Sequence, residues 1–190
     1  METNLKRIIG ALVLSLFAFA APALASERLQ IVVSFSILGD MVRQVTGDLA
    51  DVTTIVGPDA DAHFYQPSMA DVKAVAGADI VFVNGLGFET WSDALISNAG
   101  GDASVVVATA GVEPILVNGE IDPHAWNALT NGVIYVENIA AAMAAADAGN
   151  ADAYKANAAS YIAKLRALHA SAADRFGSLP EDCLLYTSDA

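Results

Sequence analysis

The chain has 190 residues, which is enough for one sizeable core, or for one lobe and the beginning of another. Its formal net charge of −13 argues against nucleic acid as a partner, because phosphates would be repelled by so acidic a surface. The single cysteine, Cys183, excludes a framework of internal disulfides.

The first 25 residues have the layout of a secretory signal peptide. Lys6 and Arg7 precede an apolar run over residues 8–21, and small residues occupy positions 23 and 25. The run is too short for a comfortable membrane span. We therefore expect cleavage after Ala25 and export of the remaining chain. No later apolar run reaches about 20 residues, so no membrane span is expected in the mature chain.

Short apolar runs then alternate with amphipathic segments. Strands are expected over residues 29–35, 52–56, 80–83 and 104–108. Helices are expected from Leu38 to Gly47 and from Phe88 to Asn98. Between them, Ser68 and Asp71 form a capping pair that predicts the start of another helix, with Met69, Val72 and Val75 facing inward. This alternation predicts an α/β fold, with a parallel four-stranded sheet flanked by helices on both faces.

Two further helices are expected in the second half of the chain. The first covers residues 130–146, and the segment Asp147-Ala148-Gly149 ends it. The second runs from about residue 150 to Phe176, roughly 40 Å at 1.5 Å per residue. That length exceeds what one small sheet needs, and a strut joining two lobes is preferred over an isolated coiled-coil strand. The expected division is a lobe over 26–146, a linker helix over 147–177 and the start of a second lobe over 178–190.

Two of the three histidines lie in similar local sequences, Asp61-Ala62-His63 and Asp122-Pro123-His124. Neutral imidazole is a common ligand of zinc-like metals, and a carboxylate two residues away can hold the other ring nitrogen. His63 follows the second predicted strand and His124 follows the fourth. Because ligands gather at the carboxyl ends of parallel strands, both rings are expected to converge on one cation. The alternative for each is a partly buried histidine bonded to a backbone carbonyl.

Other signals in the chain are weaker. Glu120 or Asp122 would complete a two-histidine, one-carboxylate set with the same histidines, as in non-haem iron enzymes, but no acid-base or nucleophile motif accompanies it. The glycines of Gly85-Leu86-Gly87 predict a tight turn rather than a dinucleotide site, since Thr90 replaces the third glycine of that motif. Phe88 and Trp91 are expected to pack, and His169 to face solvent.

Five stretches carry a resemblance to a known family. They are residues 33–38 (VSFSIL), 61–67 (DAHFYQP), 78–87 (ADIVFVNGLG), 122–126 (DPHAW) and 134–139 (IYVENI). Across residues 29–182 the chain resembles the zinc/manganese-type (cluster A-I) substrate-binding proteins of bacterial ABC importers, a family that includes proteins once described as adhesins. The resemblance implies a binding protein and not an enzyme, with two α/β lobes joined by a rigid helix. It also implies that His63 and His124 are metal ligands, with Asp61 and Asp122 in supporting positions.

The same resemblance implies the cargo, the partners and the location. The cargo would be Zn²⁺ or Mn²⁺, with no organic cofactor, and the partner an ABC permease at the inner membrane. The full-length protein is expected to be a periplasmic monomer, and adhesion to a host surface is an alternative role. Some zinc-binding members carry a histidine-rich loop before the second motif. Residues 112–121 contain no histidine. Their composition argues slightly against a high-capacity zinc collector, but it does not exclude zinc and does not decide which metal is bound.

The family pattern breaks at Cys183. Residues 183–190 (CLLYTSDA) look like a translated sequencing adaptor and are expected to be non-native. The second lobe, with the remaining metal ligands, is therefore expected to be missing. Without that lobe the long helix should expose apolar surface, for which Tyr161, Leu165 and Leu168 are the candidates.

Overall fold

The computed structural model describes residues 28–177 and residue 179. The predicted signal peptide, and the segment 183–190 with its predicted non-native origin, lie outside the described residues. The described elements are β1 (Leu29–Phe35), α2 (Ser36–Thr46), β2 (Ala50–Val56), α3 (Met69–Ala76), β3 (Ile80–Val83), α4 (Ser92–Ala99), β4 (Ser104–Val107), β5 (Leu116–Val117), β6 (Glu120–Ile121), α5 (Leu129–Ala146) and α6 (Ala151–Gly177).

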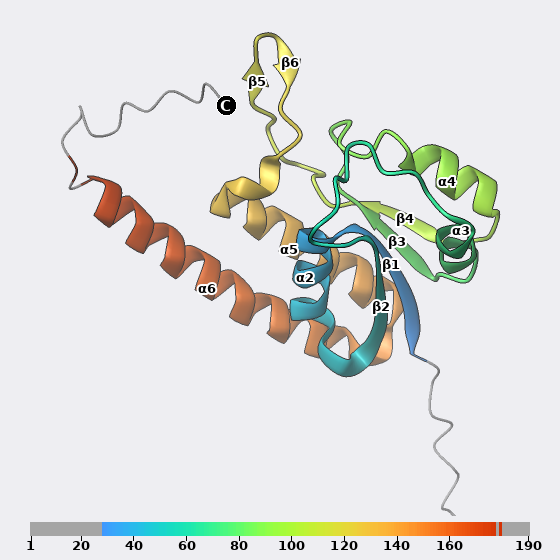
Figure 1. Cartoon of the computed structure of the whole chain (residues 1–190). Coiled ribbons are helices and arrows are strands. Elements are labelled where there is room, and N and C mark those ends of the chain that lie inside the picture. The colour runs from blue at the N-terminus through green and yellow to red at the C-terminus, as the bar shows by residue number, and fades with distance from the viewer. Residues whose placement is uncertain (1–27, 178, 180–190) are drawn as a thin grey trace, which may run out of the picture.

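Four parallel strands form the sheet, in the order β2-β1-β3-β4. The central strands β1 and β3 carry the apolar runs 31–33 and 80–83, and every residue of both runs is buried. Such runs are stable only when helices cover both faces of a sheet. Helices α3 and α4 pack together on one face, while α2 and α5 lie on the other (Figure 1). The predicted fold class is therefore confirmed.

The corner between α5 and α6 is built on a single carboxylate. Asp147 accepts hydrogen bonds from the Asn150 amide (2.6 Å) and from the buried Tyr154 phenol (2.8 Å). These two hydrogen bonds, in that order, lower the pKa of Asp147. From this corner α6 returns across α5 and α2 and then runs on beyond the lobe (Figure 1). None of the helices in the described part is long and apolar enough to cross a membrane.

One face of the long helix α6 is buried as far as Leu165, and the helix is largely exposed beyond that residue. Leu165 is only 8% exposed, so its expected exposure was wrong, because the side chain packs beside Gly132 of α5. Tyr161 is half-buried, and Leu168 is exposed as expected. Phe176, near the end of the helix, is 61% exposed. The apolar stripe therefore continues past the part of α6 that this lobe covers.

Two local expectations differ from the structure. Met69 is 71% exposed and does not face inward, because it lies in the exposed first turn of α3 and Val75 supplies the buried contact. The capping pair itself is confirmed: the Ser68 side chain accepts from the Asp71 N–H, and the Asp71 side chain accepts from the Ser68 N–H. The helix expected from Phe88 begins only at Ser92, because the preceding residues form a turn.

The predicted tight turn after β3 is confirmed by its backbone angles. Gly85, Leu86 and Gly87 have φ values of 87°, 56° and 76°. A Cβ on Gly85 would lie 2.5 Å from the Val107 side chain and 2.9 Å from the Thr109 hydroxyl. Gly85 is thus required both by its conformation and by the close approach of β4. A Cβ on Gly87 would meet no atom within 4 Å.

The two glycines allow strain and crowding to be separated by mutation. Gly87→Ala should lower the free energy of unfolding by about 1–2 kcal/mol, because only the left-handed conformation is penalised. Gly85→Ala should cost about 1–3 kcal/mol more, because the new methyl also collides with β4. Urea denaturation of the two variants measures the difference. Equal losses would show that the contact with Val107 and Thr109 imposes no constraint.

A second prediction concerns the pH dependence of stability. The pKa of Asp147 is lowered in the folded state, so its contribution is present above the unfolded pKa and is lost as pH falls through the folded value. Asp147→Asn should therefore be less stable than the wild type at neutral pH, and the difference should shrink as the pH falls below the ordinary aspartate value of about 3.9. Urea midpoints measured across this range test it. Asp102→Asn, at an exposed position between α4 and β4, controls for the loss of one charge and should show no such convergence.

Candidate metal centre

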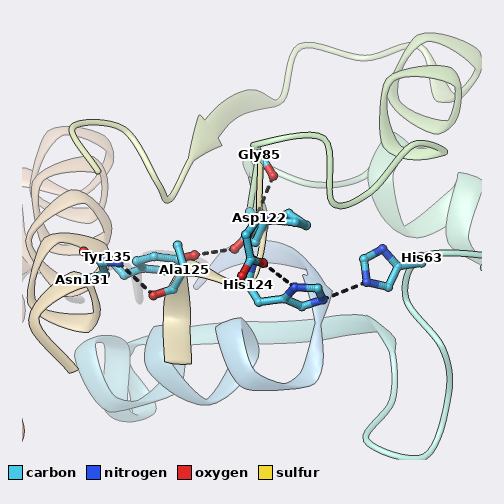
Figure 2. A network of polar contacts seen from close by, with 9 residues as sticks. His63, Gly85, Asp122, His124, Ala125, Asn131 and Tyr135 are labelled. Atoms are coloured by element: carbon cyan, nitrogen blue, oxygen red, sulfur yellow. Dashed lines mark hydrogen bonds and ion pairs between the residues drawn. The ribbon is translucent and has the colours of Figure 1, made fainter. Parts of the chain in front are cut away.

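His63 and His124 meet at the carboxyl edge of the sheet. His63 lies in the loop that follows β2, and His124 immediately precedes the 3-10 helix Ala125–Asn127. Although 61 positions separate them, their Nε2 atoms are 3.0 Å apart, and the two rings point towards each other from different segments (Figure 2). The expected convergence of the two histidines is confirmed.

Each histidine is held by the aspartate two residues before it, but in different ways. The Asp61 carboxylate accepts a hydrogen bond from the His63 backbone N–H at 2.8 Å. The Asp122 carboxylate accepts from the His124 backbone N–H at 3.0 Å and also lies 2.6 Å from Nδ1 of the His124 ring. The contact with the backbone, and then that with the ring, lower the pKa of Asp122. A neutral His124 that donates Nδ1–H to Asp122 carries its lone pair on Nε2.

Aromatic side chains pack against the two imidazoles. The Phe88 ring packs edge-on against His63, with centroids 4.6 Å apart, and lies 5.9 Å from His124. Trp126 contacts both Phe88 and His124. Trp91 donates its indole N–H to the Ala62 carbonyl at 2.7 Å and so anchors the loop that carries His63. Phe88 and Trp91 are packing residues, as predicted, but Phe88 packs against the two histidine rings themselves.

A buried polar network beneath the histidines was not predicted. Glu89 is buried and accepts hydrogen bonds from the Ser34 hydroxyl (2.5 Å) and from the backbone N–H groups of Asn84 (2.7 Å) and Gly85 (3.2 Å). The Asn84 side chain in turn accepts from the Tyr135 phenol at 2.5 Å. The only signal in the sequence was an acidic residue inside an otherwise apolar segment. Its partners lie up to 55 positions away, and local patterns do not identify them.

The carboxylates do not complete a three-ligand set with the histidines. Asp122 contacts Nδ1 of His124, whereas Nε2 of that ring faces His63. Glu120 lies on the exposed strand β6. Among the residues that the structure describes, no group of three or more His, Cys, Asp or Glu side chains is arranged to hold a metal. The geometry therefore gives no support to the two-histidine, one-carboxylate alternative.

Comparison with known proteins places the chain in a family. Residues 31–190 match the family model of the zinc-uptake complex component A, periplasmic (ZnuA). The chain is 37% identical over 177 residues to the manganese ABC transporter substrate-binding lipoprotein PsaA of Streptococcus pneumoniae, covering 87% of this chain and 57% of that protein. It is 33% identical over 174 residues to the iron-binding protein YfeA of Yersinia pestis, with 88% and 56% covered.

Solved structures give the same relationship. The fold is similar to that of a manganese-bound periplasmic metal binding protein from Candidatus Liberibacter asiaticus, with a TM-score of 0.68 and 39% identity, over 72% of this chain and 52% of that one. A cadmium-bound form of the same protein matches equally well.

The chain spans about half the length of the curated relatives that it matches. The names of these relatives describe binding components and not enzymes. A family model that covers most of the chain, relatives above 30% identity and a shared fold all agree. The chain therefore belongs to the family of the periplasmic zinc-uptake complex component A.

Proposed function

We propose that this chain is the metal-capturing lobe of a receptor that delivers a divalent transition metal to a bacterial ABC importer, with His63 and His124 as ligands. The observation that carries the proposal is the 3.0 Å separation of the two Nε2 atoms. Two nitrogens bound to a tetrahedral zinc at about 2.0–2.1 Å lie about 3.3 Å apart. A small increase in the distance between the two Nε2 atoms would therefore accommodate the ion without a change in the fold of either loop.

The neighbouring groups have supporting roles in this proposal. Asp122 holds Nδ1 of His124, which orients the ring and makes Nε2 a better donor. Asp61 fixes the backbone at His63. Phe88 covers both rings from one side and limits the ways in which they can turn away from the cation.

The proposed cargo is Zn²⁺ or Mn²⁺. Two imidazoles suit zinc, while manganese requires more oxygen ligands than the described residues of the site supply. The relatives are named for manganese and iron, and the solved relatives contain manganese and cadmium. We propose that a second lobe, beyond the linker helix α6, supplies the remaining ligands.

The proposed location is the periplasm and the proposed partner is an ABC permease at the inner membrane. The matching family is described as periplasmic, and the relatives as substrate-binding components of ABC transporters. The signal-like pattern of residues 1–25 agrees with export. In this proposal the full-length receptor acts as a monomer.

Metal binding should depend on both histidines. His63→Ala and His124→Ala should each weaken Zn²⁺ binding by about 100-fold or more, since losing an outer-shell partner alone costs about 10- to 100-fold. Calorimetric titration of this chain with Zn²⁺ and with Mn²⁺ measures the effect. His169→Ala, an exposed histidine on α6, is the matched control and should bind as the wild type does. Unchanged affinity in the His63 and His124 variants would refute the proposed site.

The two aspartates should differ in their effect on metal affinity. Asp122→Asn should weaken Zn²⁺ binding by about tenfold or more, because a neutral amide oxygen beside Nδ1 makes the His124 ring a poorer metal ligand than a carboxylate does. Asp61→Asn should have a smaller effect, because its amide oxygen can still accept from the His63 backbone N–H. The same titration compares them. A larger loss in Asp61→Asn would contradict the role assigned to Asp122.

A further inference from the structure

We propose that Asn84 and Tyr135 are positioning residues for His124: Asn84 holds the Pro123 carbonyl, Tyr135 holds the Asn84 amide, and together they set where Nε2 of His124 points. This inference deepens the proposed metal-capturing function and rests on it. It assigns a role to part of the buried network that contacts neither the cation nor the histidine rings.

The peptide group between Pro123 and His124 is held at both ends. Its carbonyl oxygen accepts a hydrogen bond from the Asn84 side-chain amide at 3.0 Å. Its N–H, which belongs to His124, donates to the Asp122 carboxylate at 3.0 Å. Fixing both ends fixes the plane of the peptide and with it the position of the His124 Cα atom, from which the side chain leaves the backbone.

The orientation of the Asn84 amide is itself determined. Its NH₂ group donates to the carbonyls of Pro123 and Gly85, so a flipped amide would place oxygen against oxygen. Its oxygen accepts from the Tyr135 phenol at 2.5 Å. Burial, and then the charge of Glu89, raise the pKa of Tyr135, so that the phenol keeps its proton and remains a donor.

The backbone of Asn84 is equally constrained. Its N–H donates to the Glu89 carboxylate at 2.7 Å, and its carbonyl accepts from the Thr109 hydroxyl at 2.6 Å. Both of its backbone polar groups and both ends of its side-chain amide are thus engaged at the end of β3. Tyr135 is fully buried on α5, so two separate elements hold this one amide.

The loop that carries His124 obtains little support from the segment before it. Strands β5 and β6 form a hairpin that stands out from the lobe (Figure 1), and Leu116 and Ile121 on it are both exposed. The contact between Asn84 and the Pro123 carbonyl therefore ties this loop to the end of β3 immediately before the ligand residue.

The test is Zn²⁺ titration of Tyr135→Phe and Asn84→Asp in this chain. Tyr135→Phe deletes one hydroxyl and should weaken binding by about tenfold, the lower end of the range for outer-shell partners. Asn84→Asp should weaken it further, because a carboxylate oxygen would face the Pro123 carbonyl. Tyr154→Phe is the matched control: Tyr154 is also fully buried with a hydroxyl bonded to one partner, Asp147, at the α5–α6 corner. It should lower stability without changing affinity.

Histidine-ring NMR of the metal-free chain supplies a second readout. The chain has only three histidines, so their ring signals can be assigned by single substitutions. Tyr135→Phe should shift or broaden the His124 signals and leave those of His169 in place. A merely structural role would move the His124 signals no more than Tyr154→Phe does.

The outcomes separate this inference from the function on which it rests. If His63→Ala and His124→Ala lose Zn²⁺ binding while Tyr135→Phe and Asn84→Asp bind as Tyr154→Phe does, the positioning role is overturned and the metal site stands. If the two histidine variants bind as tightly as the wild type, the proposed function fails and the positioning role fails with it. Weakened Zn²⁺ binding together with altered His124 ring signals supports the inference. If either Tyr135→Phe or Asn84→Asp does not fold, the other variant provides the same test.

Discussion

The close approach of two imidazole nitrogens is the contact on which the rest of the site depends. Nε2 atoms at 3.0 Å repel each other when both carry lone pairs, unless a proton on one ring or a cation between them relieves the repulsion. Asp122 favours the tautomer of His124 whose Nε2 is unprotonated. The pair is therefore held in an arrangement that a positive charge would stabilise.

The parallel sheet makes this arrangement possible by gathering distant segments at one edge. The site takes His63 from the loop after β2, Phe88 from the turn after β3 and His124 from the segment after β4, and Phe35 at the end of β1 packs against Phe88. No local interaction could bring these four together. Among the described residues, no buried side-chain nitrogen or oxygen lacks a hydrogen-bond partner, so the scaffold beneath the rings is fully satisfied.

The first and second halves of α6 differ in their surroundings. Residues such as Tyr154 and Ala158 close the core of the lobe, whereas Leu168 and Phe176 are more than half exposed. Exposed apolar side chains in a row on a helix indicate a surface that another part of a protein covers. The chain spans about half the length of its curated relatives. In our proposal, the second lobe would pack against the exposed end of α6.

The sequence alone was enough to predict the fold class, the four strands and the meeting of His63 with His124. Apolar periodicity and capping residues act over a few positions, and the order of strands and helices then implies where their ends gather. The resemblance to a family of metal-binding receptors, carried by the two histidine motifs, also came from the sequence.

Tertiary packing decided what depends on distant partners. It packs Phe88 against both imidazole rings and buries Leu165 against α5. It also brings Tyr135 into a hydrogen bond with Asn84, 51 positions earlier in the chain. It also separated two aspartates that look alike in the sequence, since only Asp122 reaches its histidine ring. Such contacts are selected by the shape of the whole core and by the need to pair every buried polar group, and a local pattern records neither.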